Sequence, residues 1–505
     1  MSGSPRSSTS AESLSSGRRS PIGGFDSSAA LILEPDVEDT TESHPFDFTS
    51  DDETDDDLTE QTDRLLSSSV PPLSSLTVFL YLLSPFLKLG AFLVPDAGLP
   101  LRYGIPVLLF FAGLSALTRQ IWYMLARYVR RADLEEIVLQ TFARDRRKEG
   151  TRWLLRQLVR FGVGLLRVLI AALYLRAAVD VLLPLVPATL VIPPRVLLTI
   201  ILAAVICPIC FAPSLGATSV LYASWISVTA YAAWFACTAY AHAKGMLVVN
   251  PGSASLGILW EGSSIIAFAF STSSTIPLYA ALKGTIQAAQ DRPRRSQSFK
   301  LLSVLSIGLA ALCIFPLVFF QSPANSPTLP TATLKILTAL SNAVALALSL
   351  PAVLISSPPL PIPFSIRHAT NFPLSRSLLY AIILCLSLLP RSLSGVLSDF
   401  LLVLAFLSTY MLPAFIHITL HNFREPLSII IPPSTPVTAA SPFTPEPSSA
   451  MSDSRHDELL QRKERTLQRR RLGKRIIWDL GVWLLLVPVS GGGLVWAAGR
   501  IVGKF

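Results

Sequence analysis

The residues of this sequence most able to do chemistry are the ionisable side chains inside its apolar segments. They are Lys88, Arg167, Arg176, Asp180, Glu261 and Asp399. A charge in the hydrocarbon core of a bilayer is costly unless it faces a cavity or a partner, so such residues mark functional sites. We interpret Arg176 and Asp180, one helical turn apart, as an intrahelical ion pair. Glu261 and Asp399 are the candidate ion-coupling carboxylates, and snorkelling to a nearby membrane surface is the alternative for both.

Other spacings of reactive residues are less informative. Cys207 and Cys210 form a C-x-x-C pattern in an apolar segment without the soluble βαβ pattern of a redox site, so we interpret both as small buried thiols. His417 and His421 are one helical turn apart without a third ligand nearby, which favours an interfacial polar pair over a metal site. The sequence has no P-loop, nucleophile-elbow or zinc-protease motif. We therefore expect no enzyme activity, no cofactor and no metal.

Two apolar segments contain residues that interrupt a helix. In the first, Gly90 and Pro95 lie close together, and in the second the hydroxyl residues 271–275 precede Pro277. Non-helical backbone at membrane depth is tolerated where it lines a cavity, and broken helices at matching positions of two repeats are typical of a transporter's substrate site. We expect both helices to be broken. Proline kinks that only adjust packing are the alternative.

The composition indicates a membrane environment for most of the chain. Of 505 residues, 51% are hydrophobic and 15% are charged, and the mean hydropathy is +0.52. Soluble domains carry about 25% charged residues. The formal net charge is +9. Because an excess of Lys and Arg beside apolar spans is typical of cytoplasmic membrane loops, we expect a lipid bilayer and no nucleic acid among the partners.

Apolar segments of about 17 to 28 residues recur from Leu76 onward, each long enough to cross a hydrocarbon core roughly 30 Å thick. The sequence therefore predicts an all-α integral membrane protein with eleven transmembrane helices. The fourth span is the least certain, because Pro208 and Pro213 interrupt it. The expected spans are residues 74–95, 101–126, 161–185, 195–212, 216–243, 255–282, 301–321, 333–355, 376–392, 395–420 and 476–498.

Loop charges orient these spans. Loop 127–160 carries ten Lys and Arg residues, loop 283–300 carries five, loop 367–376 two and loop 424–475 ten. These are the even-numbered loops, whereas the odd-numbered loops hold only scattered single charges. Because Lys and Arg in short loops stay in the cytoplasm, we expect a cytosolic N-terminus and an external or lumenal C-terminus.

The expected domains follow from the same pattern. Residues 1–73 hold 16 acidic and 4 basic residues and few aromatic ones, which predicts a disordered acidic cytosolic tail open to cytosolic regulators. Residues 74–420 form the expected ten-helix core. Residues 421–475 form a cytosolic linker with a charged helix, and residues 476–505 hold the eleventh helix and a short C-terminus.

Two sequence patterns point to a family. Residues 265–279 run from an aromatic-rich stretch through a polar break to a proline and a tyrosine, and residues 393–420 carry Leu-Pro-Ala-Phe near their end. These patterns resemble the sixth and penultimate spans of the amino acid/auxin permease family, a branch of the amino acid, polyamine and organocation superfamily. In the first span, only Gly90 and Pro95 match that family well, and Lys88 stands beside the break.

The resemblance implies a five-plus-five inverted repeat with broken helices 1 and 6, to which the eleventh helix is an addition. It also implies secondary active transport of amino acids, coupled to protons or sodium, by alternating access around the two breaks. Exposed backbone in the first break would bind the carboxylate and amine of the substrate, and hydroxyls and aromatic rings in the sixth would complete the site. The implied substrate-binding residues are Gly90, Ala91, Phe92, Leu93, Val94, Phe268, Phe270, Ser271, Thr272, Ser273 and Ser274.

The family and the tail together favour a vacuolar or other endomembrane location over the plasma membrane. Residues 63–66, Asp-Arg-Leu-Leu, approximate an acidic dileucine sorting signal. The alternative function is a non-transporting membrane amino acid sensor or receptor of the same fold. Its tail and its 421–475 loop would contact cytosolic partners.

Overall fold

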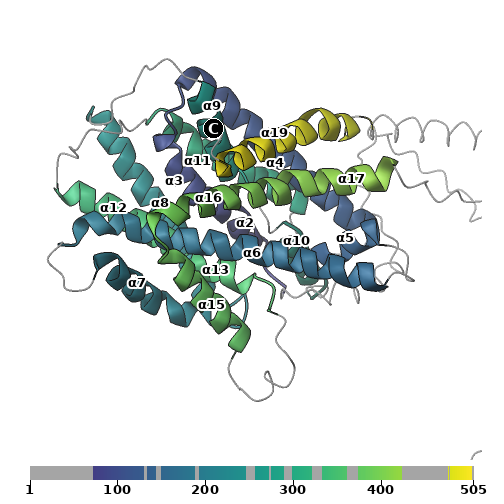
Figure 1. Cartoon of the computed structure of the whole chain (residues 1–505), viewed down its shortest axis with the longest axis horizontal. Helices are drawn as coiled ribbons and strands as arrows, with labels where there is room; N and C mark the ends of the chain where they lie inside the picture. The colour runs from purple at the N-terminus through teal and green to yellow at the C-terminus, as the bar shows by residue number, and fades with distance from the viewer. Residues whose placement is uncertain are drawn as a thin grey trace, which may run out of the picture. The chain divides into compact units, whose positions relative to one another are not determined.

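The computed structural model of the chain describes residues 72–129, 133–143, 149–187, 193–245, 256–271, 275–288, 298–320, 332–360, 373–422, 476 and 478–502 (Figure 1). Every regular element in these ranges is helical, and no strand occurs among them. The all-α part of the expected fold class is thereby confirmed. The expected acidic tail, apart from its last two residues, and the linker at 423–475 lie outside the described residues.

The helices follow one another with short connections. The N-terminal half comprises α2 (Ser75–Leu83), η1 (Ser84–Leu87), α3 (Leu89–Leu93), η2 (Pro95–Ala97), α4 (Leu101–Val129), α5 (Leu134–Phe142), α6 (Glu149–Leu182), η3 (Leu183–Leu185), α7 (Pro194–Cys210) and α8 (Thr218–Ala243). The C-terminal half comprises α9 (Leu256–Ala269), α10 (Thr275–Ala288), α11 (Phe299–Ile314), η4 (Phe315–Val318), α12 (Ala332–Ala347), α13 (Leu350–Ile355), α15 (Leu374–Ser387), α16 (Arg391–Phe406), η5 (Leu407–Met411), α17 (Leu412–Asn422), η6 (Val482–Leu486) and α19 (Val487–Ile501).

Within the described residues, eight helical segments are long and apolar enough to cross a membrane. They coincide with eight of the expected spans. Shorter apolar helices occupy the other three positions: Pro194–Cys210, Gly257–Ala269 and Leu374–Ser387. The protein is therefore an all-helical chain whose apolar helices are compatible with a multi-pass integral membrane protein.

Several of the long helices are interrupted next to a proline. α2 stops at Leu83, just before Pro85, and the chain leaves helical geometry at Lys88, whose φ is −126° and ψ −148°. α12 ends at Ala347, and Pro351 lies in the first turn of α13. Proline lacks the N–H that a helix interior needs but fits the first turn of a new helix, so each interruption falls where the sequence restarts the helix.

The π-helical segments η5 and η6 have the same cause. Each precedes a proline by two residues: η5 comes before Pro413 and η6 before Pro488. The proline ring would clash with the carbonyl four residues earlier in a regular helix, and a wider turn relieves that clash. η5 therefore interrupts the helix from Arg391 to Asn422 without ending it.

A buried arginine secures the end of α2. Arg119 of α4, 1% exposed, donates to the carbonyl of Leu82 at 2.8 Å and to Ser306 Oγ of α11 at 2.8 Å. Its guanidinium lies 4.4 Å from the centre of the Phe86 ring. The last carbonyls of a helix have no partner within the helix. Arg119 satisfies one of them, and it ties α2, η1, α4 and α11 together.

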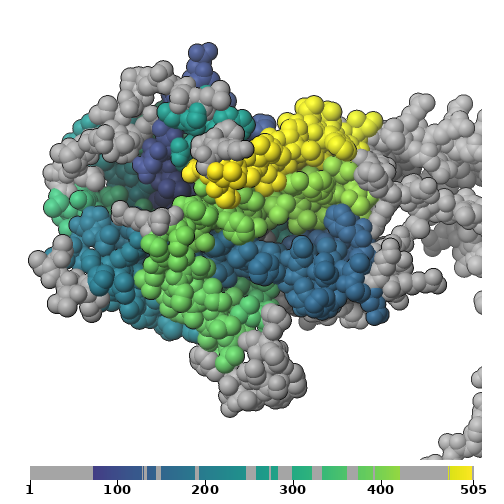
Figure 2. Space-filling model, viewed as in Figure 1, coloured from purple at the N-terminus to yellow at the C-terminus, as the bar shows by residue number. Residues whose placement is uncertain are grey.

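The last helix packs along α16 and α17, as Figures 1 and 2 show for its yellow ribbon and surface beside the green ones. Asp399 Oδ1 pairs with Arg500 Nε at 3.2 Å near one end, and His417 Nε2 lies 3.0 Å from Asp479 Oδ1 near the other. Asp399 precedes His417 by 18 residues, or about 27 Å of helix, close to the thickness of a hydrocarbon core. These two contacts, the end clamps, fix the antiparallel register.

Candidate functional site

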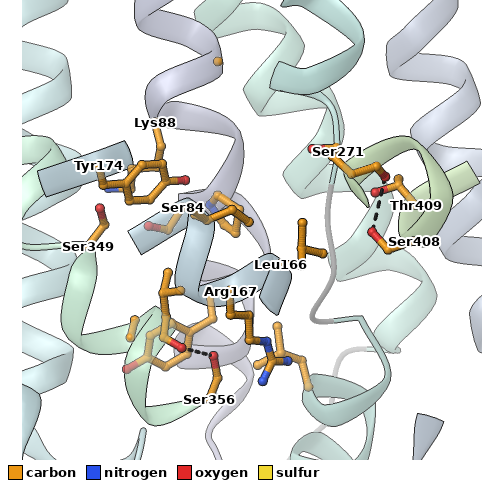
Figure 3. A pocket seen from close by; sticks show the side chains of 18 of the residues that line it. Ser84, Lys88, Leu166, Arg167, Tyr174, Ser271, Ser349, Ser356, Ser408 and Thr409 are labelled. Carbon is orange, nitrogen blue, oxygen red and sulfur yellow. Dashed lines mark hydrogen bonds between the residues drawn. The ribbon is translucent and has the colours of Figure 1, made fainter. Parts of the chain in front are cut away.

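A cavity of about 120 Å³ lies where the interrupted helices meet (Figure 3). Its walls come from the α2–α3 break, the α9–α10 break, the start of α13 and the π-helical segment η5. The continuous helix α6 supplies a further wall. Such a volume holds several water molecules or a small organic solute. The cavity therefore has the position and size of a solute site at membrane depth.

Lys88 enters the cavity wall at the point where the first helix is broken. It is 1% exposed, and its Nζ donates to Ser227 Oγ of α8 and lies 3.5 Å from the carbonyl oxygen of Ala345 in α12. Ser227 Oγ also donates to that carbonyl at 2.5 Å. All of these partners are neutral. Lys88 thus links the break to two other helices without a counter-charge among the residues that the structure describes.

Arg167 is the second cation of the cavity. It lies on α6, is 6% exposed and lines the cavity. Within the described ranges it makes no hydrogen bond or ion pair, whereas the next buried arginine on the same helix does. Arg176, 5% exposed, donates to the carbonyl of Leu389 at 2.8 Å and lies 3.7 Å from Asp180 Oδ2. The expected Arg176–Asp180 pair is therefore present, and Arg195 joins it at 3.2 Å from Asp180 Oδ1.

Small hydroxyl side chains line the space around these cations (Figure 3). Most of them donate to a carbonyl of their own helix three residues back, at 2.5 to 3.2 Å. A hydroxyl that donates in this way keeps its oxygen lone pairs available as acceptors. The residues that do so are Ser271, Ser349, Ser356 and Ser408.

Three of the expected substrate-binding residues line the cavity: Gly90, Phe268 and Ser271. Thr272, Ser273 and Ser274 lie outside the described residues. The remaining five are Ala91, Phe92, Leu93, Val94 and Phe270, and none of them lines the cavity.

Those five residues pack elsewhere. Phe270 is fully buried beside Phe86, with ring centres 5.7 Å apart, and Phe92 packs edge-on against Trp234 at 4.5 Å. Ala91 and Val94 are buried, and Leu93 is 37% exposed. The reason is that residues 89–93 form the helix α3. The expected non-helical backbone lies earlier, at Lys88.

Gly90 has a packing role at this site. A Cβ placed on it would overlap the Cα of Ala269 and lie 2.8 Å from both the Cβ and the N of that residue. The glycine therefore allows α3 and α9 to touch through their backbones. The two expected breaks meet at this contact, which forms one side of the cavity.

The candidate coupling carboxylates lie apart from the cavity. Asp399 and Glu261 both face Arg500 on α19, with separations of 3.2 Å for Asp399 Oδ1 to Nε and 3.8 Å for Glu261 Oε1 to Nη1. Neither lines the cavity. Both belong to the surface end of the last helix, where the Arg500 charge accounts for them.

Sequence reasoning missed several members of the cavity. Arg167 was recognised as an ionisable residue inside a span but was not assigned to the site. Ser349 precedes Pro351 by two residues, and Ser408 and Thr409 precede Pro413 by a few. A hydroxyl residue shortly before a proline inside an apolar span is the signal that identified Ser271, and it would have found these residues too.

The remaining reactive residues have ordinary surroundings. Cys207 and Cys210 are free thiols on α7, the second fully buried and the first half-buried. His417 contacts Asp479, and the side chain of His421 lies outside the description. No group of three His, Cys, Asp or Glu residues able to hold a metal ion occurs within the described ranges.

Comparison with protein-family models and with curated proteins found no match for this chain.

Proposed function

We propose that this protein is a secondary active transporter of amino acids that works by alternating access around the cavity. The observation that carries the proposal is the coincidence of the cavity with interruptions in its surrounding helices. Broken helices expose backbone polar groups, which at membrane depth need a polar cavity to satisfy them. In transporters such breaks form the solute site near the bilayer midplane.

The arrangement of the breaks supports a moving gate. α2 and α3 meet at the non-helical Lys88, and α9 and α10 are separated by residues 270–274, so each outer half-helix can rotate about its break. The Gly90–Ala269 contact couples the two halves, because α3 cannot move without α9. The continuous α6 provides the fixed wall. Small rotations about such hinges are the usual means of domain and gate closure.

Eleven crossings and the five-plus-five inverted repeat are part of the proposal. Three contacts support the expected alternation of sides. Leu73 N donates to the carbonyl of Ala281 at 3.1 Å, which pairs the start of span 1 with the end of span 6. Arg376 donates to the carbonyls of Ala212 and Pro213 at 2.6 and 2.9 Å, which joins two even-numbered loops.

The third contact is the grouping of Glu261, Asp399 and Arg500, which would all be external or lumenal in this topology. With it, the N-terminus is cytosolic, as the loop charges predict. We retain the amino acid/auxin permease-like assignment, proton coupling, and a vacuolar or other endomembrane home as parts of the same proposal.

The experiment is uptake of a panel of labelled amino acids by proteoliposomes containing the full chain, with an imposed pH gradient. Ser271→Leu places an apolar side chain against the cavity and should abolish uptake. Ser398→Leu makes the same change on an exposed face of α16 and should leave uptake unchanged. Wild-type uptake by Ser271→Leu would contradict the assigned site. Binding without uptake or counterflow by the wild-type chain would favour the sensor instead.

A further inference from the structure

The cavity has an unbalanced charge. Lys88 and Arg167 both line it, and no carboxylate is among its described lining residues. Neither cation has an ion-pair partner within the described ranges. A buried cation without a counter-charge is strongly unfavourable, and proteins normally pair or hydrate such groups. The position of these two side chains, together with the contrast between the unpaired Arg167 and the paired Arg176 on the same helix, indicates that the missing negative charge comes from a ligand.

A helix end adds to the positive potential. The first turn of α10, which begins at Thr275, contributes Pro277 and Leu278 to the cavity wall. The N–H groups of a helix's first turn have no partners within the helix, and the helix dipole makes this end partly positive. In combination with a nine-tenths buried arginine aimed at the same space, this end favours an anionic group.

The hydroxyl groups supply the complementary feature. Ser271, Ser349, Ser356 and Ser408 each donate to a carbonyl of their own helix, so their remaining lone pairs can accept from a ligand ammonium group. The cavity thus offers cations for carboxylates and neutral acceptors for an amine. A neutral amino acid would leave one of the two cations without a counter-charge.

We propose that the solute of this cavity is an acidic amino acid, which carries two carboxylates and one ammonium group, with one carboxylate bound by the Arg167 guanidinium. This inference rests on the proposed transport function and names its substrate class. Guanidinium and carboxylate groups form two parallel charge-assisted hydrogen bonds, which gives specificity as well as affinity. Lys88 supplies the second positive charge at the opposite side of the cavity in Figure 3.

The test compares two probes of equal size, L-glutamate and L-glutamine, which differ by replacement of a carboxylate with an amide. Binding of each labelled compound is measured on the purified full chain, and uptake is measured in proteoliposomes. The wild-type protein should prefer glutamate by roughly 10- to 100-fold, the difference expected for a charge-assisted pair against a neutral hydrogen bond.

Three substitutions on α6 assign the preference to one side chain. Arg167→Gln should bring the glutamate and glutamine affinities to within about threefold of each other. Arg167→Lys keeps the charge but loses the planar fork, and should retain a reduced preference. Arg176→Gln is the matched control, because it removes an equally buried arginine from the same helix that does not line the cavity. It should lower the melting temperature and leave the preference unchanged.

The melting temperature without ligand separates binding from a structural role. Arg167→Gln removes an uncompensated buried charge, so the unliganded variant should melt no lower than wild type, and glutamate should no longer raise its melting temperature. A lower melting temperature of this variant, or an acid preference that survives in it, would overturn the inference. Equal binding of glutamine and glutamate by the wild type would also overturn it and leave amino acid transport standing. Failure to bind or transport any amino acid would refute both proposals.

Discussion

Replacement of Gly90 by alanine tests the contact on which the proposed gate depends. The new Cβ would overlap the Cα of Ala269 and lie 2.8 Å from two further atoms of that residue, whereas ordinary carbon contacts lie at about 3.5 to 4.0 Å. The backbones of α3 and α9 must therefore separate by about 1 Å. Overpacking of this kind costs typically 1–3 kcal/mol, and a backbone neighbour cannot rotate away as a side chain can.

The assay has two readouts, the free energy of unfolding in detergent and the initial rate of uptake in proteoliposomes. Gly90→Ala should lower both. Gly113→Ala and Gly308→Ala are matched controls on α4 and α11, because nothing lies within 4 Å of a Cβ at either position. Alanine is the better helix former by about 1 kcal/mol, so these controls should be neutral or stabilising.

A double substitution sharpens the result. Gly90→Ala combined with Ala269→Gly removes one of the two atoms that lie 2.8 Å from the new Cβ but leaves the overlapping backbone Cα. Only part of the lost stability should return. Gly90→Ala with wild-type stability and uptake would refute the close approach of α3 and α9, and full recovery in the double variant would show that side chains alone make the contact.

Three other outcomes are expected. Tyr410→Phe removes the hydroxyl that donates to the carbonyl of Ala267 at 3.0 Å, and denaturant unfolding should show a loss of about 1–3 kcal/mol, because the buried carbonyl loses this donor. Gly493→Ala places a Cβ 2.5 Å from the ring of the buried Phe406; it should destabilise the chain by about 1–3 kcal/mol, and a smaller residue at 406 should reduce that loss in a double-mutant cycle. Epitope tags at the N-terminus and after Phe505 should be accessible from opposite sides of the membrane in protease protection, and access from one side would contradict an odd number of crossings.

The helical class and most helix positions could be predicted because hydropathy and proline placement are local properties. The break between α9 and α10 was expected from the hydroxyl run and Pro277, and Phe268 and Ser271 line the cavity as predicted. The first break was placed one turn too late. Pro85 ends α2, and the packing of Gly90 against α9 allows residues 89–93 to remain helical.

Pairing between distant residues could not be predicted. Arg167 and Arg176 look alike in sequence, and only the carbonyl of Leu389, more than two hundred residues away, distinguishes them. In the same way, Glu261 and Asp399 were candidates for ion coupling because their common partner, Arg500, comes from the last helix. Local patterns identify costly charges, but the fold decides which of them are already compensated.

The end clamps have a consequence for the order of assembly during synthesis. The last helix leaves the ribosome after residues 423–475, when α16 and α17 already exist. Until it docks, Asp399 lacks Arg500, His417 lacks Asp479, and the Phe406 ring faces lipid instead of Gly493. A chain stopped within that segment therefore carries uncompensated polar groups on a membrane-facing surface. Cellular quality control that recognises such groups would retain the shortened protein in the compartment where it was made, so the last helix acts as a completion signal as well as a packing element.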